Sequence, residues 1–124
     1  MSDAVKVRPW PTNLEFDRVA RLLRIAFDDG ASFAIPFELL RVESPSAENK
    51  GHGGEEKPPP KGKANVGVVE AVPVGRYAVR IVFDDGHDTG FYAWDLLYKL
   101  GRDKDDLMQR YRETLQARAL RDEA

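Results

Sequence analysis

Apolar and polar residues alternate with a period of two in two short stretches of the chain, Leu23–Phe27 and Val79–Phe83. Each stretch runs into the same three residues, Asp28-Asp29-Gly30 in the first case and Asp84-Asp85-Gly86 in the second. A period of two is typical of a half-buried strand. Asp-Gly favours a tight hairpin because both residues tolerate a positive φ. The pattern therefore predicts two β-hairpins.

The segments that follow the two turns are also alike. After the first turn the alternation resumes until Pro36, and Phe37–Leu40 can form a short helical turn. After the second turn, Phe91–Ala93 leads to Trp94–Leu97. Matched positions are Arg24 with Arg80, Phe27 with Phe83, Gly30 with Gly86 and, one residue further out, Leu39-Leu40 with Leu96-Leu97. We expect two equivalent units, each a strand-turn-strand followed by a short helix.

A strand is also expected ahead of the first hairpin. Leu14–Phe16 alternates as an edge strand would, although the longer stretch from Leu14 to Leu23 can be drawn as a helix capped by Thr12 or Asn13. We favour the strand.

The segment between the two units, Ala47–Ala64, combines glycines and three consecutive prolines with charged residues. Because it has nothing to bury, its composition predicts a mobile loop. A strand is expected to follow at Val66–Val72, and Pro73–Gly75 is expected to turn the chain into the second unit.

The last segment, Asp103–Leu120, predicts a helix with Asp103 at its N-cap and acidic residues in its first turn. One face carries the apolar residues Leu107, Met108, Tyr111 and Leu115. We favour docking of this stripe on the domain's own sheet. A contact with a partner or a second copy stays open, because Gly101 would close the preceding turn and let the helix swing away.

Together these elements predict an α+β fold: a small, mainly antiparallel β domain with two repeated strand-turn-strand-short helix units and a C-terminal helix. We divide the chain into an N-terminal tail over residues 1–10, the domain over 11–101 with its mobile loop at 47–64, and a C-terminal amphipathic helix over 102–124. A length of 124 residues allows one hydrophobic core.

The charge balance narrows the range of partners. Nineteen basic and 21 acidic residues give a formal net charge of -2, so no positive field is available to hold a phosphate backbone. No stretch is long and apolar enough to cross a bilayer, and the N-terminus does not resemble a secretion signal. With no cysteine, disulfides and thiolate chemistry are excluded. We expect a cytoplasmic protein, a monomer or weak dimer with a protein partner, and neither nucleic acid nor membrane.

Catalytic chemistry finds little support among the residues. His52 and His87 are the two side chains that titrate near neutral pH. A Ser-His-Asp triad would need Ser44 or Ser46, but Pro45 between them shapes an irregular turn and no base lies at a useful spacing. We expect no enzyme, no catalytic residues and no cofactor.

Acidic residues gather at the turns: Asp28, Asp29, Asp84, Asp85 and Asp88. We interpret them as turn formers that accept backbone hydrogen bonds, because neighbouring residues of a strand end point to opposite faces and the calcium-loop spacing is missing. We assign no metal site, although a site combining His52, His87 and Asp88 is left open.

Aromatic and arginine side chains near the second hairpin invite a binding role. Trp94, Phe91 and Tyr92 could form a recognition platform, but aromatic residues after an alternating strand more often fill a core. Arg24 and Arg80 are expected to reach solvent or to pair with aspartates.

Several runs resemble one known family, the gamma-butyrobetaine hydroxylase-like N-terminal domain. The similarity covers roughly Pro11–Gly101. It is carried by Leu23–Gly30, Ile35-Pro36-Phe37-Glu38-Leu39-Leu40-Arg41-Val42, Ser44-Pro45-Ser46-Ala47-Glu48, Gly51-His52-Gly53, and Val74-Gly75-Arg76-Tyr77-Ala78-Val79 onward to Asp95, including Phe-Asp-Asp-Gly-His-Asp-Thr-Gly.

The resemblance implies a fold more than an activity. In carnitine-pathway hydroxylases of this family the domain precedes a catalytic barrel and holds a structural zinc with three cysteines and a histidine. By that resemblance the cysteines correspond to Ser44, Ser46 and Asn49 here, and the histidine to His87. A hydroxyl is a poor zinc ligand, so the fold is implied without the metal.

The resemblance also suggests a role as an accessory module. A related domain ends some iron-sulfur carrier ATPases of plastids, which suggests by analogy an adaptor linked to iron-sulfur or 2-oxoglutarate oxygenase systems. Our hypothesis is a non-catalytic accessory or protein-interaction domain, with the C-terminal helix and the face around Trp94 as contact surfaces. The alternative is an iron- or zinc-binding protein that uses His52, His87 and nearby carboxylates.

Overall fold

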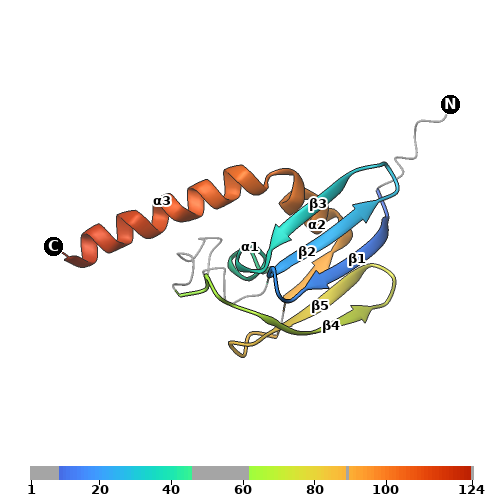
Figure 1. Ribbon diagram of the computed structural model, residues 1–124, viewed down its shortest axis with the longest axis horizontal. Helices are drawn as coiled ribbons and strands as arrows, with labels where there is room; N and C mark the ends of the chain where they lie inside the picture. Colours follow the sequence, from blue (N-terminus) through green and yellow to red (C-terminus); the bar gives the residue numbers. More distant parts are fainter. Residues whose placement is uncertain (1–8, 46–61, 89, 124) are drawn as a thin grey trace, which may run out of the picture.

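The computed structural model describes residues 9–45, 62–88 and 90–123. It contains two three-stranded antiparallel sheets, each in sequential strand order and each followed by a helix (Figure 1). The first half comprises β1 (Pro11–Asp17), β2 (Leu22–Phe27), β3 (Ser32–Pro36) and α1 (Phe37–Val42). The second comprises β4 (Val68–Val74), β5 (Ala78–Phe83), β6 (Gly90–Ala93) and α2 (Trp94–Arg102), and α3 (Lys104–Glu123) ends the chain. The predicted α+β fold is confirmed.

The two central strands form because their alternate residues can be buried together. In β2 the buried residues are Leu23, Ile25 and Phe27, and in β5 they are Val79, Ile81 and Phe83. These side chains meet those of α1 and α2 in one core, as expected when each sheet must cover one apolar face. The predicted edge strand is also confirmed, because β1 pairs with β2 alone.

The two hairpin turns have the same geometry. In the first, the Gly30 N–H donates to the Phe27 carbonyl at 3.1 Å and the Phe27 N–H donates to the Ala31 carbonyl at 2.8 Å. Gly30 and its counterpart Gly86 have φ values of 89° and 92°. Both predicted hairpins are present, and in each turn the glycine alone takes a positive φ. A three-residue loop needs only its last residue in the left-handed region.

Equivalent backbone hydrogen bonds confirm the predicted duplication. The Asp28 N–H donates to the Trp10 carbonyl at 2.8 Å, and the Asp84 N–H donates to the Gly67 carbonyl at 2.9 Å. The β1–β2 and β4–β5 pairings also shift register at equivalent points, between Pro11 and Asn13 in β1 and between Val68 and Glu70 in β4. The N–H of Phe37, which begins α1, donates to the carbonyl of Arg21 in the β1–β2 turn. In the same way, the N–H of Trp94, which begins α2, donates to the carbonyl of Tyr77 in the β4–β5 turn.

Two predicted turns are wrong. Pro73 and Val74 belong to β4, and the turn lies at Gly75–Tyr77, where Gly75 has a φ of 57°. Pro73 is tolerated because β4 is an edge strand, whose outward N–H need not join the ladder. Gly101 does not close a turn; it lies within α2 and packs against the ring of Phe33.

The C-terminal helix docks on the domain through its first half. Met108 and Tyr111 are buried, and Leu107 and Leu115 pack against the core. The stripe therefore docks on the domain itself, but its main neighbours are the helices α1 and α2 and not the sheet that was predicted. Beyond this stripe α3 extends away from the sheets (Figure 1), and Leu120 is 69% exposed.

The predicted mobile loop at 47–64 falls almost entirely outside the described residues. Among the helices of the described part of the chain, none is both long and apolar enough to cross a bilayer.

Candidate functional site

In each half of the domain, the helix forms a hydrogen bond with the Asp-Asp-Gly turn of the other half. The Tyr98 hydroxyl, on α2, donates to Oδ2 of Asp29 at 2.7 Å. Reciprocally, Nε of Arg41, on α1, donates to Oδ2 of Asp85 at 2.9 Å. Arg41 and Tyr98 are each the fifth residue of their helix, and the two aspartates hold the same place in their turns. The halves thus contact one another as the subunits of a twofold dimer do.

The contact between α1 and the second turn contains a buried polar cluster, which we call the Ser44–His87 centre. It comprises Arg41, Ser44, Lys63, Asp85, His87 and Tyr92. Oγ of Ser44 lies 2.8 Å from Nε2 of His87, and these residues are only 1% and 3% exposed. The Tyr92 hydroxyl donates to the Leu40 carbonyl at 2.5 Å. Hydrogen bonding of these groups is what makes their burial tolerable.

A glycine makes room for this centre. A Cβ placed on Gly90 would lie 2.7 Å from Oγ of Ser44 and 2.8 Å from the ring of Tyr92. These separations are shorter than side-chain packing allows. Gly90 therefore lets the end of α1 approach β6 closely enough for the Ser44–His87 hydrogen bond.

Apart from the Tyr98–Asp29 hydrogen bond, the equivalent contact between α2 and the first turn is aromatic. The ring of Tyr98 lies 4.9 Å from that of Phe27 and 5.2 Å from that of Phe33, both edge to face. The repeat relates each residue of this contact to one at the Ser44–His87 centre. The corresponding pairs are Ala31 with His87, Phe33 with Gly90, Tyr98 with Arg41, and Gly101 with Ser44. The duplication therefore carries one polar and one aromatic contact.

Electrostatics in the Ser44–His87 centre are dominated by Asp85. Nζ of Lys63 lies 2.6 Å from Oδ2 of Asp85, and the His87 N–H donates to Oδ1 at 3.1 Å. Burial by itself raises the pKa of Asp85, but the hydrogen bonds from Lys63, the His87 N–H and Arg41 outweigh it and lower that pKa from 3.8 to about 2. Burial likewise raises the pKa of Tyr92. Asp85 is therefore an anion and Tyr92 a neutral donor at neutral pH.

The turn aspartates accept backbone hydrogen bonds, as predicted. Oδ1 of Asp28 accepts from the Trp10 N–H at 3.0 Å, and Oδ1 of Asp29 accepts from the Ala31 N–H at 2.9 Å. Asp85 does the same with His87 in the second turn. These bonds fix the loops and account for Asp28, Asp29 and Asp85 as turn formers.

The residues described do not fit the structural zinc that the family resemblance implies. Ser44 and His87, two of the four corresponding positions, do lie together. Ser46, Asn49 and His52 lie outside the described residues. Within residues 9–45, 62–88 and 90–123, no group of three His, Cys, Asp or Glu side chains could hold a metal ion. The neutral Ser44 hydroxyl binds His87 where a zinc site needs a thiolate.

The spacing of residues along the chain does not predict the proximity of Ser44 and His87. They lie 43 positions apart in the chain, so local spacing gives no signal. Their correspondence to two zinc ligands in the resembling hydroxylases was the signal that could have paired them. Both side chains are buried in the structure.

The aromatic residues near the second hairpin have separate roles. Tyr92 is buried in the core, as expected, and Trp94 is half-buried with its indole N–H donating to the Arg76 carbonyl at 2.7 Å. Phe91, in contrast, is 54% exposed. Arg24 pairs with Asp17 at 2.5 Å, whereas Nη1 of Arg80 donates to the Asp88 carbonyl at 3.1 Å.

The outward surface of the second sheet is mainly apolar, and we call it the apolar face. Cross-strand pairing places Val72, Arg80 and Phe91 side by side, and Val74, Ala78 and Ala93 in the next row, with Val82 and the exposed Glu70 in the row on the other side. Directly opposed residues of antiparallel strands project to the same side of a sheet. The corresponding outward positions of the first sheet are more polar and include Asn13, Glu15, Asp17, Arg24 and Ser32.

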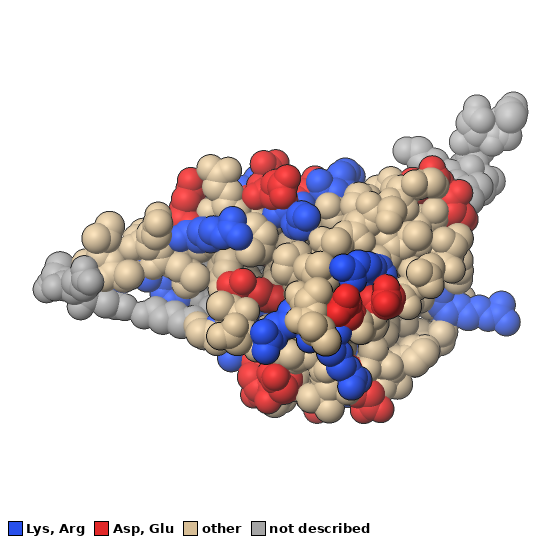
Figure 2. All heavy atoms as spheres, in the orientation of Figure 1, with Lys and Arg blue, Asp and Glu red and all other residues tan. Residues whose placement is uncertain are grey.

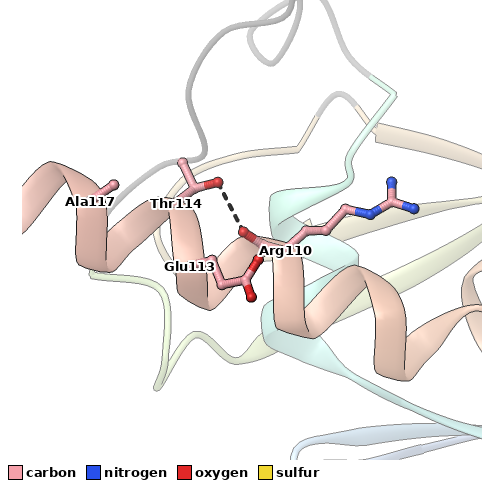
Figure 3. A pocket seen from close by; sticks show the side chains of 4 residues that line it. All are labelled: Arg110, Glu113, Thr114 and Ala117. Atoms are coloured by element: carbon pink, nitrogen blue, oxygen red, sulfur yellow. Dashed lines mark hydrogen bonds between the residues drawn. The ribbon is translucent and has the colours of Figure 1, made fainter.

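The other surfaces of the described residues give weaker indications of a binding site. Acidic and basic side chains are interspersed over the face of the molecule shown in Figure 2, without a broad region of one sign. A shallow hollow along α3 is lined by Arg110, Glu113, Thr114 and Ala117 (Figure 3). There Thr114 Oγ1 donates to the Arg110 carbonyl at 2.9 Å and Gln109 donates to Glu113 at 3.2 Å, so the hollow presents groups already bonded within the helix.

The fold and these contacts define a class of small, internally duplicated α+β domains. The sequence profile described as gamma-butyrobetaine hydroxylase-like, N-terminal, matches residues 14–98, and the chain belongs to that family. No curated protein matches the chain.

Solved structures support the same assignment. One protein solved by NMR is 46% identical with a TM-score of 0.74, covering 90% of this chain and 83% of its own. A second NMR structure is 39% identical with a TM-score of 0.77, covering 90% and 87%. A crystal structure from Acidithiobacillus ferrooxidans is 37% identical with a TM-score of 0.60, covering 73% and 91%, and is described as a DUF971 family protein of unknown function.

Proposed function

We propose that this chain is a non-catalytic accessory domain that binds another protein through the apolar face. The exposure of Phe91, 54% on the outward side of β6, carries this proposal. Val74 in the neighbouring row is 39% exposed. Contiguous apolar residues on a folded surface typically mark a contact with a partner. The face lies next to Trp94, the region that the sequence suggested.

Comparison within the chain strengthens the proposal. Glu15 and Asp17 of the first sheet correspond to Val72 and Val74 of the second, and Ala34 corresponds to Phe91. The two sheets share strand order and turn geometry, so the fold itself does not require an apolar outward surface. Selection for a contact gives a reason for the difference.

The duplication also gives the buried centre a structural role. The Ser44–His87 centre lies between α1 and the second turn, a position equivalent to that of the aromatic contact between α2 and the first turn. Both contacts join one half of the domain to the other. A domain of this kind fits an adaptor, a cytoplasmic monomer or weak dimer linked to iron-sulfur or 2-oxoglutarate oxygenase systems, as membership of the family suggests.

The interaction is tested by pull-down of the tagged chain from cells, with mass spectrometry of the captured proteins. We expect a partner that is captured by the wild type and lost with Phe91→Ser. Val19→Ser serves as a control, because Val19 is an exposed apolar residue on the β1–β2 turn, 93% exposed. A partner captured equally by both variants, or none above background, would contradict binding through the apolar face.

Metal analysis tests the alternative function. We expect chain purified without a histidine tag to carry far less than one equivalent of zinc or iron, because the hydroxyl of Ser44 is a weak ligand. The measurement is elemental analysis by mass spectrometry, repeated with His87→Ala. Stoichiometric metal in the wild type that is lost in the variant would establish the metal-binding alternative.

A further inference from the structure

Arg80 occupies the centre of the apolar face. Its cross-strand neighbours are Val72 on β4 and Phe91 on β6. Its guanidinium donates to one backbone carbonyl, that of Asp88. Among the residues described, Arg80 forms no ion pair with a carboxylate. A half-buried cation with five N–H donors thus lies on a mainly apolar surface.

The equivalent arginine in the first sheet shows what has changed. Arg24 has Glu15 opposite it and pairs with Asp17 at 2.5 Å. The second sheet keeps the cation as Arg80 but has Val72 and Val74 in place of those two acidic residues. The second sheet thus has no carboxylate directly opposite Arg80, although Glu70, opposite Val82 in the neighbouring row, lies on the same face.

Resting on the proposed function, we infer that the apolar face binds a protein segment carrying one Asp or Glu between branched or aromatic apolar residues. The carboxylate would pair with Arg80, whose fixed fork of donors matches a carboxylate's two oxygens. The flanking apolar side chains would cover Phe91 and Val74. Displacement of water from this apolar surround strengthens the ion pair relative to one in open solvent.

Charge complementarity indicates which kind of ligand the apolar face would bind. A phosphate-rich polymer would need several cations, and the face offers Arg80 among valines, alanines and Phe91, with the carboxylate of Glu70 one row away. A purely apolar segment would leave the guanidinium covered without a partner, which is costly. An acidic side chain within an apolar segment meets both requirements.

A random peptide library displayed on phage, selected against the full chain, tests this inference. We expect the enriched peptides to share an acidic residue flanked by apolar residues. A synthetic peptide with that sequence should bind at least about tenfold more weakly to Arg80→Glu and also more weakly to Phe91→Ser. Arg24→Glu, the matched change on the first sheet, should leave affinity unchanged. Replacing the acidic residue of the peptide with lysine should restore binding to Arg80→Glu.

Several outcomes would overturn the inference: no enrichment, enriched peptides without an acidic residue, or equal binding by the wild type, Arg80→Glu and Arg80→Gln when circular dichroism shows all three folded. Concentration-dependent dimerisation abolished by Phe91→Ser in sedimentation would make a second copy the occupant and reject a foreign segment. If a cellular partner depends on Phe91 but not on Arg80, the proposed function stands and the acidic-segment inference falls.

Discussion

Replacement of Asp85 with alanine is expected to lower the free energy of unfolding by about 2 kcal/mol, because it removes the carboxylate shared by two cations at a partly buried site. The side chains of Arg41 and Asp85 are 9% and 18% exposed, and that of Lys63 is 20% exposed. Breaking one member of such a group leaves charge that water solvates poorly. Urea unfolding at neutral pH measures the loss.

Asp29→Ala is the matched control. Asp29 has the equivalent turn position but accepts from the neutral hydroxyl of Tyr98 at an exposed site. Its removal should cost clearly less than removal of Asp85. If the two variants lost equal stability, the contribution of Asp85 would come from turn geometry rather than from its cations.

The pH dependence of stability provides a second measurement on Asp85. Its pKa is about 2 in the folded protein, below the ordinary 3.8, so the carboxylate stabilises the fold when ionised. This contribution, on the order of 2 kcal/mol, is complete well above pH 4 and is lost as pH falls from about 4 towards 2. The stability difference between wild type and Asp85→Asn should therefore shrink over that interval.

The second large effect is expected at Gly101, where alanine should lower the free energy of unfolding by about 3 kcal/mol. In an ordinary exposed helix the same change is stabilising by about 1 kcal/mol. Here a Cβ would lie 2.6 Å from the Cβ of Phe33 and closer still to its ring. Because that ring is packed between Phe27 and Tyr98, it has little room to move.

A double-mutant cycle isolates this contact. Phe33→Ala removes the ring that the new methyl group would strike, so the double variant should lose less stability than the sum of the two single losses. Thermal or urea unfolding of all four proteins gives the coupling. A Gly101→Ala variant as stable as the wild type would show that α2 shifts freely on the first sheet, contrary to the close packing described.

Local patterns predicted the repeating elements because their causes are local. The alternation in Leu23–Phe27 and Val79–Phe83 matches β2 and β5, and Gly30 and Gly86 end both turns. The turn after β4 was misplaced because proline usually ends a strand, and only the position of β4 at the sheet edge makes Pro73 acceptable.

Contacts between the halves could not be read from the sequence repeat. A repeat does not specify whether two hairpins join one sheet or face each other, so the pairing of Arg41 with Asp85 had no signal in spacing. The role of Gly101 was missed for the same reason, since a helical glycine reveals its function only when Phe33 is placed against it. Phe91 is exposed because the register of β6 directs Tyr92 inward, opposite Val79.

The reciprocal contacts between the halves have a consequence for how the chain folds during synthesis. The first turn is completed by Tyr98, 69 positions later, and α1 is bonded to Tyr92, 52 positions after Leu40. The first sheet therefore lacks its partners until almost the whole domain has left the ribosome. Such distant contacts favour slow, all-or-none folding, and the nascent first half presents its apolar residues to chaperones while it waits.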